Sequence, residues 1–363
     1  MTNETNFNEE IVNEVAPTEE VEAVVEESSL NEENGAQNQK PPFNLKKFLH
    51  KIKFDKWKAW LYLSPALVLL AIFTVWPIIN TVRIAFLEGY NSYQNLGGTT
   101  FEVGFGNFAY VIGYPKFINA LTTTMLLCVL TVPISTFLAL LIAVGLNSIK
   151  FLSRFLQTIF FLPYVTNSIA IGMVFAAMFD IVGTNGVIST YGLINNFLGL
   201  FGIDPIGWTT VGPDGKYSYA ANIAVMTIYI VWNALPFKIL VLLGGLQGIN
   251  KQYYDAAKVD GTSRARVFGR ITVPLLSPMI AYVVITGFIG GFKEYTSIVG
   301  VFGDKYMGPV GATYNLNTMV GLIYDSLKDG WLGDASAAAL ILFGIILVVT
   351  LINLQVSKKK THY

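Results

Sequence analysis

The sequence predicts an all-α, multi-pass membrane protein with six transmembrane helices and with both termini in the cytosol. Hydrophobic residues make up 53% of the 363 residues and charged residues only 13%. The mean hydropathy of +0.52 is far above that of a soluble domain. Six segments are long and apolar enough to cross a hydrocarbon core, which needs about 20 helical residues. Lysine and arginine gather in alternate connections between these segments, and this asymmetry sets the predicted orientation.

The six predicted spans share a long run of apolar residues with few charges. They cover residues 60–86, 121–146, 155–179, 220–243, 275–292 and 336–356. Together they define a predicted transmembrane domain over residues 60–357, with a charged loop at about 246–274 between the fourth and fifth spans.

Two segments of opposite charge precede the first span. The first forty residues contain eleven glutamates and a single basic residue, Lys40. This composition cannot bury enough apolar surface to offset the entropy of ordering, so residues 1–45 are predicted to be a disordered acidic tail. Residues 46–59 carry six lysines and are predicted to be a basic segment beside the membrane surface.

Basic residues also follow the second, fourth and sixth spans, and the last of these clusters forms the C-terminal segment 358–363. The positive-inside rule therefore places these connections and both termini in the cytosol, as an even number of spans requires. The other connections, at about 88–117, 181–218 and 301–334, contain fewer basic residues and are rich in Gly, Asn and Tyr. We expect them to be short ordered loops on the external side, with a turn at the sequence GPDG, residues 212–215.

Few residues in the chain could support redox, metal or catalytic chemistry. Cys128 is the single cysteine and lies within the second predicted span, and His50 and His362 are the two histidines. A disulfide within the chain is excluded, and a catalytic site or metal site built on histidine is disfavoured. The chain is predicted not to be an enzyme, to have no catalytic or metal-binding residues and to bind no cofactor itself.

The charged loop at 246–274 has more pattern than a solvated connection requires. Asn250 is a good helix N-cap before the sequence KQYYDAAKV, and Gly261 suits the left-handed turn that ends a helix. A solvated cytosolic loop would explain the charges, but not the small pair Ala256 and Ala257 flanked by tyrosines. We expect a short helix that docks into a groove of another protein.

These residues resemble the EAA loop of the membrane subunits of binding-protein-dependent ATP-binding cassette (ABC) importers. That loop has Glu-Ala-Ala, three residues, Gly, nine residues and then Ile-x-Leu-Pro. Here the matching positions are Asp255-Ala256-Ala257, Gly261 and Ile271-Thr272-Val273-Pro274, with the spacing intact. The chain departs from the pattern conservatively, with Asp in place of Glu and Val in place of Leu.

The resemblance extends over roughly residues 60–357 and is to the carbohydrate permeases, in the larger-subunit, maltose-permease-like branch. It is carried by LSPALVLLAIFTVWPIINTV (63–82), FLPYVTNSIAIGMVF (161–175), the Gly-Pro pair at 308–309 and LGDASAAA (332–339). The resemblance implies a type I ABC importer permease fold and a sugar, in particular an oligosaccharide, as the transported substrate. The acidic tail has no counterpart in the family pattern.

The resemblance also implies how the chain works and with which partners. In the family, the EAA segment forms a coupling helix that seats in a cleft of the ATPase subunit. Carried over by position, the coupling residues are Tyr254, Asp255, Ala256, Ala257, Gly261, Arg264, Ile271 and Pro274. The sequence lacks the G-x-x-x-x-G-K-[ST] phosphate cradle, so ATP and magnesium are expected on the partner ATPases.

The implied assembly is a heterodimer with a second permease subunit, joined by two ABC ATPase subunits and an extracellular solute-binding protein or lipoprotein. It lies in the lipid bilayer of the bacterial cytoplasmic membrane and does not involve nucleic acid.

Polar residues within the spans are candidates for the translocation path, since they are costly in lipid and normally face the bundle interior. Aromatic rings beside amide and carboxylate groups suit a sugar. The candidates are Asn167, Tyr229, Trp232, Asn233, Glu294 and Tyr295. Alternatively, such residues only join helices to one another. Lys238 is expected to extend toward the cytosolic face, and Lys293 could pair with Glu294.

Two other classes of membrane protein compete with the importer subunit. A secondary transporter driven by an ion gradient would be expected to have inverted repeats or a carboxylate in mid-span, and neither is evident. A membrane enzyme would need a catalytic constellation, and the few His and Cys residues leave little from which to build one. Stimulation of a partner ATPase would distinguish the importer subunit from both.

Overall fold

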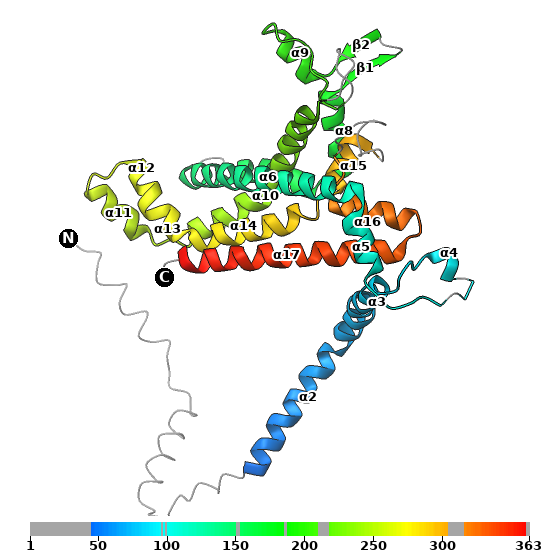
Figure 1. Ribbon diagram of the computed structural model, residues 1–363. Coiled ribbons are helices and arrows are strands. Elements are labelled where there is room, and N and C mark those ends of the chain that lie inside the picture. Colours follow the sequence, from blue (N-terminus) through cyan, green and yellow to red (C-terminus); the bar gives the residue numbers. More distant parts are fainter. Residues whose placement is uncertain are drawn as a thin grey trace, which may run out of the picture. The chain divides into compact units, whose positions relative to one another are not determined.

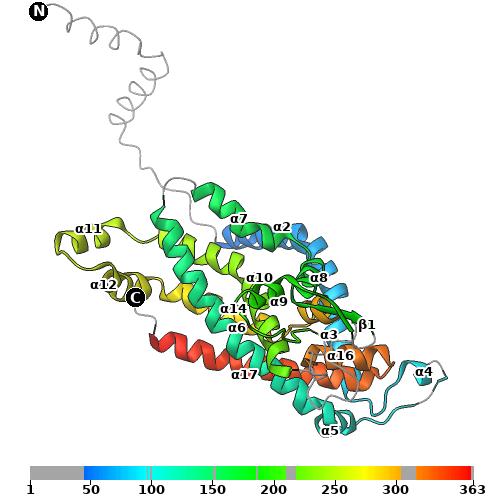
Figure 2. The same ribbon diagram turned by 90° about the horizontal axis from the view of Figure 1, so that it is seen from above.

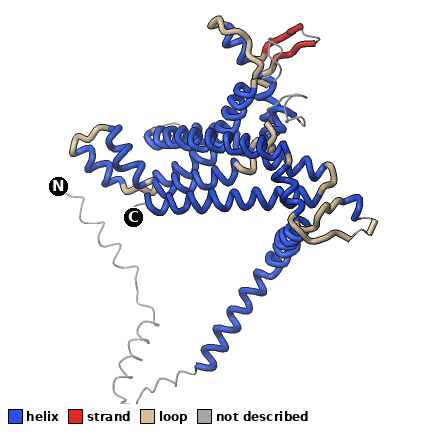
Figure 3. The backbone as a smooth tube through the Cα atoms, viewed as in Figure 1, coloured by secondary structure: helices blue, strands red, loops and turns tan. Residues whose placement is uncertain are grey.

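The computed structural model describes residues 45–360 apart from residues 96, 99, 150–152, 185–186, 210–217 and 304–315. The predicted acidic tail up to residue 44, the GPDG turn and the Gly-Pro pair at 308–309 lie outside the described residues. Within them the chain is almost entirely helical, apart from one small two-stranded sheet (Figure 3).

The chain divides into two compact units, residues 1–74 and 75–363. The first contains α2 (Leu45–Leu70) and most of the π-helix η1 (Ala71–Val75), and the second begins at α3 (Trp76–Ala85). The helical stretch Trp60–Ala85 is long and apolar enough to cross a membrane. The first predicted span is therefore confirmed as a helix, to within one residue at its C-terminal end.

The second unit is built around four helices (Figures 1 and 2). They are α6 (Pro115–Ser148), α10 (Tyr219–Gln247), α14 (Ser277–Gly291) and α17 (Leu332–Lys360). The first three pack on one another, while the fourth, α17, packs on α14. Small residues such as Ala139 and Ala143 of α6 are fully buried beside Leu242 of α10 and Val283 of α14. Such residues allow close helix packing in a bilayer, where association depends on van der Waals contact.

The third predicted span is helical but broken, and a bend precedes the helix of the fifth. The third consists of α7 (Ser153–Val165) and α8 (Ser168–Phe179), which meet at 102°. The fifth predicted span, 275–292, corresponds to α14, and a helical stretch made of α12 (Arg264–Val267), the π-helix η2 (Phe268–Thr272) and α13 (Val273–Leu275) precedes it at an angle of 69°. Within the described residues four helices qualify as single spans, or six if each bent pair counts as one.

The connections expected to be external contain short helices and a hairpin. The helices within them are α4 (Ser92–Asn95), α5 (Gly106–Gly113), α9 (Leu193–Gly199) and α16 (Met319–Lys328), and α15 (Thr296–Phe302) begins just before the last connection. The antiparallel strands β1 (Ile181–Thr184) and β2 (Val187–Tyr191) pair with a bulge between Val182 and Gly183. The expectation of short ordered loops missed these elements, because brief helices and hairpins leave little periodicity in a sequence.

Buried asparagines hold these connections in place. The Asn195 amide donates to the carbonyl oxygen of Ile206 at 3.0 Å, and its Oδ1 accepts from the Trp208 indole at 3.0 Å. Asn222 Nδ2 donates to the Trp208 carbonyl oxygen. Each bond satisfies a polar group that the surrounding apolar side chains would otherwise leave unpaired.

The two sets of connections lie at opposite ends of the long helices. The helix α11 (Lys251–Val259), α12 and the C-terminal end of α17 lie together at one end (Figures 1 and 2). The helices α5 and α16 lie at the other. This separation agrees with the predicted grouping of basic connections, and which end faces the cytosol stays a prediction.

Candidate functional site

The charged loop between the fourth and fifth spans folds as predicted into a capped helix and a turn. Asn250 Oδ1 accepts from the Gln252 backbone nitrogen at 3.0 Å, which starts α11. Gly261 has φ +63°, and the backbone nitrogen of Thr262 donates to the Ala257 carbonyl oxygen at 2.9 Å. These bonds close both ends of the helix. We call residues 250–275 the coupling segment.

The chain turns back after Gly261, and a groove forms between α11 and the next helical elements. We call it the coupling groove, and its volume is about 450 Å³. Its lining residues are Gln252, Tyr253, Ala256, Ala257, Asp260, Thr262, Arg266, Arg270 and Ile271. The predicted residues Ala256, Ala257 and Ile271 thus meet across one concave surface, although they are up to fifteen positions apart in the sequence.

The two alanines of the motif differ in exposure. Ala256 is exposed, whereas Ala257 is 5% exposed and packs against its own chain. On α11, Ala257 faces the elements onto which the chain folds back, whereas Ala256, about 100° away from it round the helix, stays exposed. The expected surface patch of two alanines is therefore reduced to Ala256, with the aromatic ring of Tyr253 beside it in the groove.

The remaining predicted coupling residues belong to the same segment but do not line the groove. The Tyr254 hydroxyl lies 3.3 Å from Thr272 Oγ1 and so joins α11 to η2. Asp255 is exposed and pairs with Lys258 at 3.1 Å. Arg264 begins α12, and Pro274 lies in α13; both are exposed.

Two arginines in the groove were missed at the sequence level. Arg266 and Arg270 line the coupling groove, and they lie outside the family pattern. Their spacing of four residues across α12 and η2, which places them on one face, was the signal that could have identified them.

A second concave surface lies within the predicted transmembrane domain, between α6, α10 and α14. We call it the membrane cavity, and its volume is about 400 Å³. Polar lining residues include Thr131, Ser135, Asn233, Lys238, Thr286, Glu294 and Ser297. Asn233 and Glu294 are thus the two path candidates that the structure brings together in one cavity.

Lys238 is buried in the helix bundle and does not extend toward the cytosolic face, so that expectation was wrong. Its side chain is 4% exposed. The ammonium group donates to Ser135 Oγ at 2.7 Å, Thr136 Oγ1 at 2.9 Å and the Val132 carbonyl oxygen at 3.2 Å. Three acceptors on adjacent turns of α6 satisfy the ammonium locally, and this outweighs its tendency to reach for water.

Three other path candidates support the break in the third span. Asn167 caps α8, with Oδ1 accepting from the Ile169 nitrogen at 2.9 Å. The Tyr229 side chain is fully buried, and its hydroxyl donates to the Ser168 carbonyl oxygen at 2.6 Å. Trp232 packs on Phe175 with ring centroids 5.5 Å apart. These contacts hold α8 against α10.

The last candidates surround the start of α15. Tyr295 stacks on Tyr324 with centroids 4.4 Å apart. Glu294 is half-buried, and its Oε1 accepts from the Ser297 nitrogen at 3.2 Å. Lys293 is exposed, and these two described side chains form no ion pair with each other.

Comparisons with known proteins agree with this architecture. The model of a family described as "Binding-protein-dependent transport system inner membrane component" matches residues 102–362. The lactose transport system permease protein LacF of Rhizobium radiobacter is 29% identical, over 81% of this chain and 91% of its own. The arabinooligosaccharides transport system permease protein AraP of Bacillus subtilis is also 29% identical, over 82% of this chain and 88% of its own.

A solved structure has the same fold. It is that of a bacterial alginate ABC transporter in complex with an alginate pentasaccharide-bound periplasmic protein. The likeness has a TM-score of 0.68 at 22% identity and covers 86% of this chain and 97% of the other. The predicted all-α importer-permease fold is confirmed.

Proposed function

Because the chain belongs to the family of binding-protein-dependent transport system inner membrane components, we propose that it is the permease subunit of an ATP-driven sugar importer. It moves its substrate by alternating access and catalyses no reaction itself. The energy comes from hydrolysis of ATP, bound with magnesium on separate ATPase subunits, which act on this chain through the coupling segment.

The observation that carries this proposal is the geometry of the coupling segment. A capped helix ends at a left-handed glycine, and a groove with one exposed alanine opens beside it at the end of the bundle. The fifth span follows directly through η2 and α13. A displacement of α11 by an ATPase subunit would therefore be transmitted to the transmembrane helices through a few packed elements.

Support for a sugar as substrate comes from the relatives and from the membrane cavity. The two relatives are a lactose permease and an arabinooligosaccharide permease by name. The cavity offers amide, hydroxyl and charged groups from Asn233, Thr286, Glu294 and others beside the ring of Phe237. A sugar uses such a surface by packing its C–H face on a ring while its hydroxyls donate hydrogen bonds to, and accept them from, the polar groups.

The working complex would contain a second permease subunit, two ABC ATPase subunits and an extracellular solute-binding protein, in a bacterial cytoplasmic membrane. The family description supports the binding protein and the membrane. The related structure in complex with a periplasmic protein supports the same arrangement.

The test compares two glycine variants in the reconstituted complex. Gly261→Asp places a side chain and a charge at a φ of +63° within the coupling segment. Gly202→Asp is the matched control, since Gly202 has φ +73° and, like Gly261, no atoms within 4 Å of a built Cβ, but follows α9. Backbone strain of about 1–2 kcal/mol is common to both.

We expect Gly261→Asp to abolish ATPase stimulation and sugar uptake at normal membrane abundance, and Gly202→Asp to retain both. Normal uptake by Gly261→Asp would refute coupling through this segment. A purified chain that transports a solute without any ATPase would refute the importer assignment itself.

A further inference from the structure

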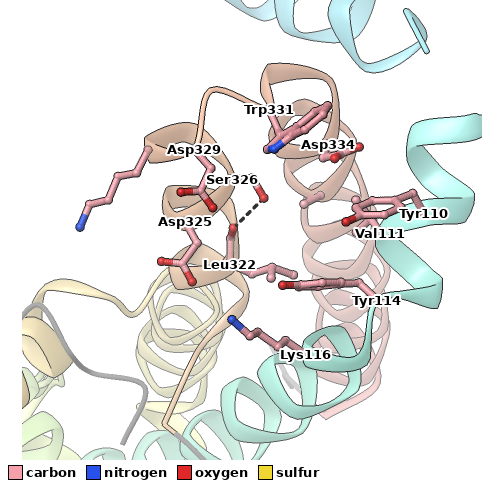
Figure 4. Close-up of a pocket in the computed structure, with 12 residues that line it drawn as sticks. Tyr110, Val111, Tyr114, Lys116, Leu322, Asp325, Ser326, Asp329, Trp331 and Asp334 are labelled. Atoms are coloured by element: carbon pink, nitrogen blue, oxygen red, sulfur yellow. Dashed lines mark hydrogen bonds between the residues drawn. The ribbon is translucent and has the colours of Figure 1, made fainter. Parts of the chain in front are cut away.

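A pocket far from both proposed sites lies at the opposite end of the bundle from α11. It is formed by α5, the start of α6, α16 and the start of α17 (Figure 4), and we call it the outer pocket. Its volume is about 280 Å³. Pockets for drug-sized molecules span about 300–1,000 Å³. The outer pocket therefore suits one small ring rather than an extended chain.

Aromatic side chains form one wall of the outer pocket. Tyr110 and Tyr114 project from α5 and the residue after it, with ring centroids 5.9 Å apart and ring planes 24° apart. Tyr110 is 59% exposed and Trp331 is 45% exposed, so part of each side chain is open to a ligand. Exposed rings beside polar groups offer an apolar face on which the C–H side of a sugar can pack.

The charged residues of the outer pocket are of both signs. Asp325 of α16 and Asp329, the residue directly after α16, lie across from the tyrosines, and Asp334 lies beside Trp331 (Figure 4). Lys116 and Lys328 also line the pocket, and the Lys116 ammonium lies 5.9 Å from the centre of the Tyr114 ring. A bound anion would face three carboxylates, and a bound cation would face two ammonium groups.

A neutral molecule with many hydroxyls is repelled neither by the carboxylates nor by the ammonium groups. Its hydroxyls can donate to the aspartates and accept from the lysines, since a hydroxyl is both a donor and an acceptor. The mixed charge and the aromatic wall therefore favour a sugar over an ionic ligand.

The outer pocket is rigidly built, which favours binding. The Asn107 amide of α5 donates to the carbonyl oxygens of Ala85 at 3.0 Å and Leu87 at 2.8 Å. A Cβ built on Gly333 would lie 2.7 Å from this amide, so α5 approaches the start of α17 as closely as a glycine allows. Gly330 has φ +80°, and the Trp331 nitrogen donates to the Ser326 carbonyl oxygen at 2.9 Å. Such preorganisation lowers the entropic cost of binding.

From this chemistry we propose that the outer pocket binds a single sugar residue on the external face, distinct from the membrane cavity. The proposal rests on the proposed function, which supplies the sugar and the orientation. Such a site would hold one end of an oligosaccharide after its release from the binding protein, before the chain enters the membrane cavity.

The experiment measures binding of simple glycosides to the full chain in lipid nanodiscs. Methyl β-D-glucopyranoside, methyl β-D-galactopyranoside and methyl α-L-arabinofuranoside are titrated separately by saturation-transfer NMR. We expect saturable, weak binding of at least one. Tyr110→Ala and Asp329→Asn should each weaken it roughly tenfold, as loss of a ring contact or a charge-assisted bond does. Tyr110→Phe, which keeps the ring, should retain most of the binding.

Matched controls lie on the other connection expected to be external. Phe201→Ala and Asp204→Asn remove an exposed ring and an exposed carboxylate outside the outer pocket, and we expect them to leave binding unchanged. Thermal unfolding of each variant checks that the fold is intact.

The results separate this inference from the proposed function. If none of the three glycosides shows saturable binding, the proposal that the outer pocket binds a sugar is overturned. It is also overturned by binding that is lost in Asn233→Ala but unchanged in Tyr110→Ala and Asp329→Asn, since the bound sugar would then lie in the membrane cavity. In either case, sugar uptake and ATPase stimulation by the complex would still support the importer. Weakened docking of the binding protein in the pocket variants, without glycoside binding, would also overturn the proposal.

Discussion

The buried ammonium of Lys238 gives a sharp quantitative test of the structure. It links α10 to α6 through Ser135 Oγ, Thr136 Oγ1 and the Val132 carbonyl oxygen. The two hydroxyls also donate to carbonyl oxygens of their own helix, those of Thr131 and Val132. The hydroxyls therefore keep a partner when the lysine is removed, whereas the lysine loses partners when the hydroxyls are removed.

This asymmetry predicts unequal costs. In Lys238→Met, three hydrogen bonds between helices are lost, at about 0.6 kcal/mol each in a membrane protein. Part of that loss is offset because no ammonium needs to be desolvated, so we expect a net cost of about 1 kcal/mol in the free energy of unfolding. Ser135→Ala combined with Thr136→Val leaves the buried ammonium with one of its three acceptors. That should cost about 3 kcal/mol, since an unsatisfied buried charge carries its full desolvation penalty.

The triple variant completes the cycle. Once Lys238 is methionine, the two hydroxyl substitutions should add little to the cost of Lys238→Met. The triple variant should therefore lose about 1–2 kcal/mol in the free energy of unfolding, less than the double hydroxyl variant loses. Thr286→Val is the control for hydroxyl loss alone, because Thr286 lines the same cavity and bonds only within its helix, to the Tyr282 carbonyl oxygen.

The assay is unfolding of the purified full chain in mixed micelles with a rising fraction of SDS, followed by circular dichroism. A cost for Lys238→Met equal to or larger than that of the double hydroxyl variant would refute the reasoning. So would a triple variant as unstable as the sum of its parts, because the residues would then act independently.

Replacing Gly172 by alanine should lower the thermal unfolding midpoint in detergent, because a Cβ there lies 2.6 Å from Gly300 Cα where α8 meets α15. Gly244→Ala, at a helical glycine with open space, should keep the midpoint or raise it slightly, since alanine is the better helix former; equal midpoints for the two variants would contradict the close approach. Asn250→Ala removes the cap of α11, which should destabilise that helix by about 1 kcal/mol. It should speed amide hydrogen exchange at residues 251–254 and reduce ATPase stimulation without abolishing it. Ser148→Ala, whose hydroxyl bonds only within α6, is its control; unchanged exchange in Asn250→Ala would show that the cap is dispensable.

Much of the fold could be predicted because the signals are local. A run of about 20 apolar residues must be helical in lipid, since every backbone polar group has to be satisfied within the segment. The six spans were placed on this basis. The signals for the start and end of α11 were equally local. Asn250 caps the helix through its own side-chain oxygen, and Gly261 ends it through its own backbone dihedral.

The site could be predicted only in part. The coupling motif placed Ala256, Ala257 and Ile271, but not which alanine is exposed, because that depends on how α11 folds back on η2. Among the path candidates, Asn233 and Glu294 share a cavity, whereas Tyr229 is fully buried against Ser168. In the sequence these residues looked alike, as polar groups within spans.

By itself, then, the sequence determined that this chain is a multi-pass helical membrane protein in which a capped, glycine-ended helix lies between the fourth and fifth spans, because hydropathy and capping act within a few residues. Only the tertiary structure decided the break in the third span, the bend before the fifth, the burial of Lys238 against α6 and the gathering of Tyr110, Asp329 and Trp331 around one pocket. These features depend on which side chains from distant segments meet, and a buried polar group is stable only where such partners satisfy it.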